Sequence, residues 1–234
     1  MNKHLTLLAL FIGIAVAAHG QLYIGVHGGA TLSTGYYAES KMSDGEWLLD
    51  GTNQFKVGAG DGFLTGLDVA YAMPFLSDLT VLLEAEFMQG SVNSDVKKYH
   101  NAHANDYEAV LPKFRNIPLL LGARYSYPLG QYYDLYGEVL GGVNIRMITP
   151  YERGVNVATY ENATTIGFRF GAGIIIRDMV TIGASYTMLG NAPLEGDYNI
   201  GNTAFTKLNP TLVTISAGFR LNPFKGLTRN VQDF

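Results

Sequence analysis

Apolar and polar residues alternate along several long stretches of the chain. In the first, residues 22–32, Leu22, Ile24 and Val26 fall on one face and the residues between them on the other. Successive side chains of a β-strand point to opposite faces, so this pattern predicts a strand with one apolar and one more polar face. The pattern recurs and predicts further strands over residues 61–72, 79–90, 114–127, 132–147, 164–176, 180–188 and 211–221.

The lengths of these strands and of their connections favour a membrane barrel. The strands have 9 to 16 residues, whereas about 9–11 suffice to cross a bilayer obliquely and strands of soluble sheets average about 5–6. Long polar connections alternate with short ones, as in outer-membrane barrels with long outer loops and short periplasmic turns. The pattern predicts an all-β fold, an eight-stranded antiparallel transmembrane up-and-down β-barrel. A soluble β-sandwich, whose strands also alternate, is the alternative. The long connections are 33–60, 91–113, 148–163 and 189–210, and the short ones are 73–78, 128–131 and 177–179.

Pro118 lies inside the fourth predicted strand. Proline cannot donate a hydrogen bond to a sheet, and a closed barrel has no free edge to accommodate it. We therefore expect a local bulge at Pro118.

The two ends of the chain differ from the segment between them. An apolar run over residues 5–18 follows polar residues, and Ala18, His19 and Gly20 form a small-x-small cleavage site, which is typical of a secretory signal peptide. We expect a signal peptide over 1–20, the barrel over 21–221 and a polar periplasmic tail over 222–234. With both termini in the periplasm, an even number of strands places all four long loops outside the cell.

Composition narrows the function classes. Charged residues make up 15% of the chain, against about 25% in average soluble domains. Without Lys3 the chain has 15 basic and 20 acidic residues, a balance that argues against a nucleic-acid partner. The absence of cysteine excludes disulfides, zinc-thiolate sites and a lipid anchor on cysteine.

The inward faces of the predicted strands carry ionisable residues of both signs. The interior of an eight-stranded barrel is just wide enough for side chains to fill, so we expect these residues to neutralise one another as a structural lumen network that leaves no pore. The alternative is that they line a narrow ion path, which would need gaps beside the inward glycines. The expected network consists of Asp68, Glu84, Glu86, Glu138, Arg124, Arg146, Arg169 and Arg220.

The sequence offers little for catalysis or metal binding. His27 faces inward, where we expect it to pair with an interior acid rather than act as a general base. The second long loop contains His100, His103, Asp106 and Glu108, which only approximate a metal-ligand set. Nucleophile elbows, phosphate loops and zinc motifs are absent from the sequence. We expect no catalytic residue, metal or cofactor.

Three segments carry a resemblance to a known family. Residues 21–29 (QLYIGVHGG), 116–125 (NIPLLLGARY) and 215–220 (ISAGFR) resemble the outer-membrane β-barrel domain family often described as porin-like. The resemblance covers essentially the whole chain after the signal peptide and implies a small barrel in the outer membrane of a Gram-negative bacterium. It implies little about activity, and the polar tail departs from the usual terminal aromatic strand.

The long loops are rich in aromatic residues, which are enriched at contact surfaces. We therefore expect a non-enzymatic barrel that contacts membrane lipid and supports the envelope or binds an external ligand or another outer-membrane protein. A narrow channel is the alternative, and a lipid-modifying enzyme is the third hypothesis. The loop aromatics are Tyr36, Tyr37, Trp47, Phe55, Tyr99, Tyr107, Tyr151, Tyr160, Tyr198 and Phe205.

Overall fold

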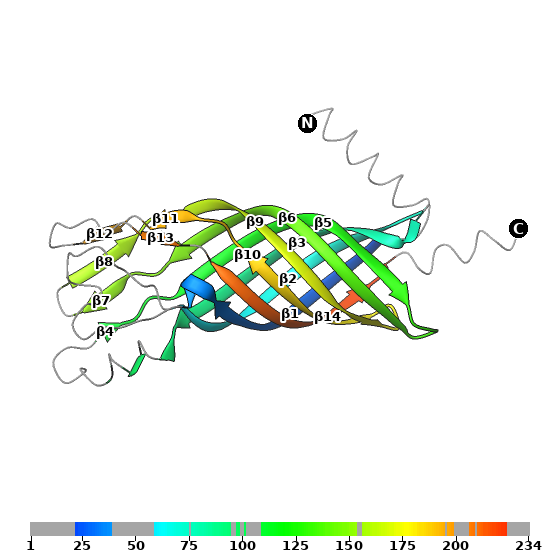
Figure 1. Ribbon diagram of the computed structural model, residues 1–234, viewed down its shortest axis with the longest axis horizontal. Helices are drawn as coiled ribbons and strands as arrows, with labels where there is room; N and C mark the ends of the chain where they lie inside the picture. The colour runs from blue at the N-terminus through cyan, green and yellow to red at the C-terminus, as the bar shows by residue number, and fades with distance from the viewer. Residues whose placement is uncertain are drawn as a thin grey trace, which may run out of the picture.

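Eight long strands form a closed antiparallel barrel (Figure 1) in the order β1-β14-β10-β9-β6-β5-β3-β2. The computed structural model describes residues 22–38, 59–74, 76–94, 97–98, 101, 109–153, 156–194, 196–198, 206–208 and 210–223. All eight predicted strands are confirmed, and each observed boundary lies within three residues of the expected one. The barrel strands are β1 (Leu22–Thr34), β2 (Ala59–Met73), β3 (Leu76–Val92), β5 (Phe114–Pro128), β6 (Tyr133–Ile148), β9 (Ala163–Ile176), β10 (Val180–Met188) and β14 (Thr211–Leu221).

The first and last strands close the barrel. β1 pairs with β14 from Ile24 opposite Leu221 to Thr34 opposite Thr211, and it pairs with β2 on its other side. Closure leaves no sheet edge, so the backbone groups of the strands bond to each other instead of to solvent. This is the condition that a β-structure must meet to cross a lipid bilayer.

The expected bulge at Pro118 is wrong. The pairing of β5 with β3 has the same register on both sides of the proline, with Leu119 opposite Ala85 and Asn116 opposite Met88. The pairing with β6 also runs through Pro118 without a shift. The missing proline N–H therefore interrupts the β3–β5 ladder locally, but no extra residue is inserted.

The outward faces of the strands form an apolar belt. Leu67, Leu121 and Ile166, for example, are 61%, 57% and 66% exposed. On the eight barrel strands, the charged residues at outward positions are Asp61 and Arg115, both close to the long-loop end. Such a continuous exposed apolar surface fits the hydrocarbon layer of a bilayer. Among the described residues, no helix is long and apolar enough to cross a membrane.

Short strands extend the structure beyond the long-loop end of the barrel (Figure 1). They form a four-stranded sheet in the order β12-β8-β7-β4 and a two-stranded sheet of β11 and β13. None of them was predicted, because segments of two to five residues are too short to display a period of two. The strands are β4 (Ala109–Val110), β7 (Tyr151–Arg153), β8 (Asn156–Tyr160), β11 (Ala192–Leu194), β12 (Gly196–Tyr198) and β13 (Thr206–Leu208).

Apolar side chains fill the barrel interior at the long-loop end. The 3-10 helix η1 (Gly35–Tyr37) follows β1, and the ring of Tyr37 packs edge-on against Phe114 with 5.7 Å between centroids. Tyr37 is only 3% exposed. We call this group the outer apolar cluster; its buried members are Tyr37, Ala59, Leu64, Met88, Val92, Phe114, Ile148, Leu189 and Leu212.

Candidate functional site in the barrel lumen

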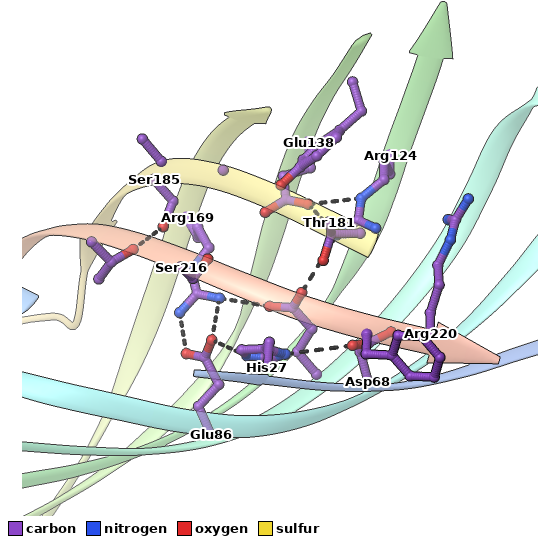
Figure 2. Close-up of a pocket in the computed structure, with 16 residues that line it drawn as sticks. His27, Asp68, Glu86, Arg124, Glu138, Arg169, Thr181, Ser185, Ser216 and Arg220 are labelled. Carbon is purple, nitrogen blue, oxygen red and sulfur yellow. Dashed lines mark hydrogen bonds and ion pairs between the residues drawn. The ribbon is translucent and has the colours of Figure 1, made fainter. Parts of the chain in front are cut away.

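A continuous chain of charged side chains crosses the lumen (Figure 2). It begins at Asp68 on β2, whose Oδ1 lies 3.4 Å from Nδ1 of His27 on β1. The Nε2 atom of the same histidine lies 2.8 Å from Oε1 of Glu86 on β3. Glu86 in turn pairs with the guanidinium of Arg169 on β9. Four side chains from four strands are thereby joined in series.

The chain continues through Glu84 to the opposite wall. Arg169 Nη1 donates to Glu84 Oε2 at 2.6 Å, and Arg124 Nη2 lies 3.9 Å from Glu84 Oε1. Arg124 donates through Nε and Nη2 to a single oxygen of Glu138, at 2.9 and 2.7 Å. Its guanidinium also lies 4.4 Å from the centroid of the Tyr136 ring. Residues that pair at these positions are no more than 12% exposed, so water screens their charges weakly.

The contacts of His27 indicate its protonation state. Both ring nitrogens face carboxylate oxygens. An ionised carboxylate can accept hydrogen bonds but cannot donate one. A neutral imidazole has one donor and one acceptor nitrogen, so it could satisfy only one of the two carboxylates. The geometry therefore fits an imidazolium that donates to both Asp68 and Glu86.

A charged His27 balances the charges around the lumen cavity. The Asp, Glu, Arg and His side chains that line the cavity supply four carboxylates, three guanidiniums and the imidazole of His27. Isolated charges are very costly to bury in a low-dielectric interior. With the imidazolium, the lining has four cations for four carboxylates, and the carboxylate of Asp178 next to Arg220 lies outside this lining. The carboxylates are Asp68, Glu84, Glu86 and Glu138, and the guanidiniums are Arg124, Arg169 and Arg220.

Inward glycines provide the space for these side chains. A Cβ atom on Gly66 would lie 2.6 Å from Nε2 of His27 and 2.7 Å from Cγ of Glu86. A Cβ atom on Gly171 would lie 2.6 Å from a carboxylate oxygen of Glu138. The charged side chains thus occupy the space that the glycines leave, and that space is not a continuous gap.

Two of the expected network residues have other surroundings. Arg220 lines the cavity but lies 3.6 Å from Asp178 in the β9–β10 turn, donates to the Asp178 carbonyl oxygen at 3.1 Å and sits 4.7 Å from the centroid of Tyr23. Arg146 is 1% exposed but does not line this cavity. It lies toward the long-loop end, near Tyr37.

Tyr37 connects the outer apolar cluster to the polar groups below it. Its phenol makes a side-chain hydrogen bond with Asn116, and burial raises its pKa above the ordinary range of tyrosine. The residue is therefore neutral at physiological pH. Asn116 accepts a hydrogen bond from Asn144 Nδ2 at 3.1 Å, so helix η1 is tied to β5 and β6.

The network leaves a small polar cavity on one side of the lumen. The cavity has a volume of about 30 Å³, enough for roughly one or two water molecules. The cavity wall opposite the charged side chains contains small residues of β10 and β14, among them Gly183, Ser185, Thr214 and Ser216.

Solved structures of small outer-membrane barrels are similar to this chain. Neisserial surface protein A is 14% identical, with 86% of this chain and 96% of that one covered and a TM-score of 0.50. The outer membrane protein OprG from Pseudomonas aeruginosa is 14% identical, with coverages of 86% and 96% and a TM-score of 0.46. A major outer membrane protein from Thermus thermophilus is 13% identical, with coverages of 86% and 99% and a TM-score of 0.46.

The closed eight-stranded topology and the similarity to Neisserial surface protein A agree. The chain has the fold of the small outer-membrane β-barrels. No protein-family model matches the sequence, and no curated protein gives a significant match.

Some expectations fall on residues that the structure does not describe. These are the signal peptide over 1–20, the set His100, His103, Asp106 and Glu108, the loop aromatics Trp47, Phe55, Tyr99, Tyr107 and Phe205, and all of the tail beyond Pro223. Within the described ranges, no group of three or more His, Asp and Glu side chains is arranged to hold a metal ion.

The role of His27 as a cation can be tested by restoring neutrality. We expect His27→Gln to destabilise the folded barrel by about 3–5 kcal/mol, because it leaves a buried carboxylate without its partner. The double variant His27→Gln/Asp68→Asn removes one charge of each sign and should recover much of that loss. Urea unfolding of refolded protein in detergent micelles, followed by intrinsic fluorescence, measures both. A double variant no more stable than the single one would contradict a charged His27.

Proposed function

We propose that this chain is a non-enzymatic outer-membrane barrel with a closed lumen, which binds a partner at the cell surface through the sheet formed by its long loops. The apolar belt and the similarity of its fold to outer-membrane barrels support the location. Leu22 and Leu221 lie at the same end as the short turns, which supports a periplasmic position for both ends of the barrel. The long loops then project outward.

The lumen network has a structural role in this proposal. Its side chains bond to one another across the barrel and fill the space beside the inward glycines. The outer apolar cluster covers the other end of the interior. The closed interior leaves the outer loops and the barrel wall as surfaces for recognition.

One observation carries the choice of the loops: three different long loops contribute strands to one sheet. β4 belongs to the second long loop, β7 and β8 to the third and β12 to the fourth. Pairing of β4 with β7 and of β12 with β8 holds these segments together beyond the barrel. An ordered sheet reduces the entropy lost when a partner binds, compared with independent flexible loops.

Position-specific photo-crosslinking in living cells tests which surface binds. A photoreactive residue would replace Thr159 on the outer sheet, Ile166 on the belt or Gln131 in the β5–β6 turn, all of which are exposed. We expect discrete adducts from position 159 only. Adducts from position 166 alone would favour binding through the barrel wall to another membrane protein. Adducts from neither position would contradict both versions of the proposal.

Membrane residence predicts a depth dependence for charged substitutions. Leu121 lies in the middle of β5 and is 57% exposed, and Leu129 follows the same strand and is 54% exposed. An arginine on the lipid face costs about 2–4 kcal/mol at the bilayer midplane and about 0–1 near the interface. Leu121→Arg should therefore destabilise the barrel in phospholipid vesicles far more than Leu129→Arg does, as measured by guanidinium unfolding. Equal effects would contradict a transmembrane orientation.

A narrow channel is the second candidate function. The cavity and its wall of small hydroxyl residues on β10 and β14 favour it. We expect purified, refolded protein in planar bilayers to show no conductance above that of lipid alone, because the ion chain occupies the lumen. Reproducible conductance steps from protein with a heat-modifiable, folded band would support the channel instead.

Lipid-modifying catalysis receives less support. A histidine that acts as a general base must present a free nitrogen to a hydroxyl or water. Both nitrogens of His27 contact carboxylates, and the residue lies inside the lumen, away from the lipid face.

A further inference from the structure

The turn between β9 and β10 holds two non-glycine residues in a left-handed conformation. Arg177 has φ 52° and Asp178 has φ 59°, and the turn closes through a hydrogen bond from Met179 N to Ile176 O at 3.0 Å. Positive φ at both central residues defines a type I′ turn, in which Asn-Gly is strongly preferred. Asp tolerates this conformation, but a long side chain such as Arg adopts it at a cost in stability. Residues held in such conformations tend to have a function that requires them.

The turn fixes the Arg177 side chain on the rim of the barrel. The Arg177 N–H donates to the carbonyl oxygen of Tyr132 at 2.8 Å. The guanidinium lies 5.2 Å from the centroid of the Tyr132 ring. Asp178, by contrast, pairs with Arg220 on the lumen side. The side chains of the two turn residues therefore make their contacts on different sides of the barrel wall.

Exposed tyrosines lie on the β5–β6 hairpin, whose strand β6 is paired with β9. Tyr125 and Tyr127 on β5 are 54% and 59% exposed, Tyr132 just before β6 is 53% exposed, and Tyr133, the first residue of β6, is 52% exposed. Tyr133 pairs with Ile176, the residue before Arg177. Tyrosine rings gather at the membrane interface because one end is apolar and the other polar. The rim thus places a cation and several aromatic rings where lipid headgroups would lie.

We propose that Arg177 and Tyr132 bind the phosphodiester of a glycerophospholipid in the leaflet at the short-turn end of the barrel. This inference rests on the proposed membrane residence. The planar fork of a guanidinium matches two phosphate oxygens, and stacking on Tyr132 orients the fork before the lipid arrives. The neighbouring tyrosines contact the glycerol and the first methylenes of the acyl chains. A site of this kind explains why an arginine occupies a turn position that asparagine would fit better.

Arg177→Asn separates binding from folding. Asparagine favours positive φ, so this variant should melt at a higher temperature than wild type in phosphate-free maltoside detergent. It should also lose the phospholipid that wild type retains. Lys113→Asn, which removes an exposed cation at the opposite end, is the matched control. If Arg177 had only a structural role, Arg177→Asn would not gain stability and lose lipid at the same time.

The measurement is the lipid phosphorus that remains with each barrel. Each protein is refolded into vesicles of phosphatidylethanolamine and phosphatidylglycerol, extracted into the same detergent and washed. We expect wild type and Lys113→Asn to retain phospholipid that Arg177→Asn and Tyr132→Leu lose, and Arg177→Lys to retain a smaller amount. Equal retention by wild type and Arg177→Asn would overturn the site.

Two further outcomes separate the possible sources of failure. If wild type retains no more phospholipid than Arg177→Asn, but inorganic phosphate raises the melting temperature of wild type and not that of Arg177→Asn, the site binds free phosphate and the lipid assignment is overturned. A wild-type chain that does not insert into the vesicles, and shows no heat-modifiable band, overturns membrane residence itself. A wild-type chain that inserts into the vesicles but retains no more phospholipid than Arg177→Asn overturns only the Arg177 site.

Discussion

The structure depends on the requirement that charges buried inside a closed barrel neutralise one another. An eight-stranded barrel has too little interior space for bulk water to solvate its charged groups. Each carboxylate of the lumen therefore needs a cation at contact distance. His27 provides it for two carboxylates at once, so a titratable group at the middle of β1 determines whether the whole set is balanced.

The same network links strands that are far apart in the sequence. Arg169 on β9 contacts Glu84 and Glu86 on β3, and these two strands are not neighbours in the barrel. Contacts across the lumen therefore add to the backbone ladders, which join only adjacent strands. At the short-turn end Arg220 extends this arrangement to the β9–β10 turn through Asp178. The strained turn is stabilised from inside the barrel, while Arg177 remains on its rim.

The sequence predicted the barrel strands because each has one consistently apolar face. It did not predict which inward charges meet. Parity places Arg146 and Arg169 on the same inner surface, but contact also depends on height along the barrel axis. Glu138 lies five residues after Tyr133, where β6 begins, and Arg146 lies thirteen residues after it. The number of residues between each position and the short-turn end of its strand would have separated Arg146 from the network. The same count places His27, five residues after the start of β1, at the height of Glu138.

Other features gave no signal in the sequence. The partnership of Arg220 with Asp178 depends on a turn whose conformation is unusual for its residues, and the alternation of apolar and polar residues does not specify that conformation. Tyr37 was one of many loop aromatics, and only the fold of η1 distinguishes it by bringing the ring against Phe114. The short outer strands pair between loops, and such pairing depends on the barrel that brings the loops together.

This arrangement divides the molecule into regions with different tolerance for change. In the lumen, substitution of a single charged residue affects several partners, because the charged side chains of the network contact one another in sequence across the barrel. The inward glycines are constrained in the same way, since Gly66 has space for a hydrogen atom only. From the sheet of short outer strands, Tyr160 on β8 packs against the outer apolar cluster, where apolar partners are interchangeable if volume is kept. Substitutions in the long loops are therefore expected to leave the charge balance of the lumen undisturbed.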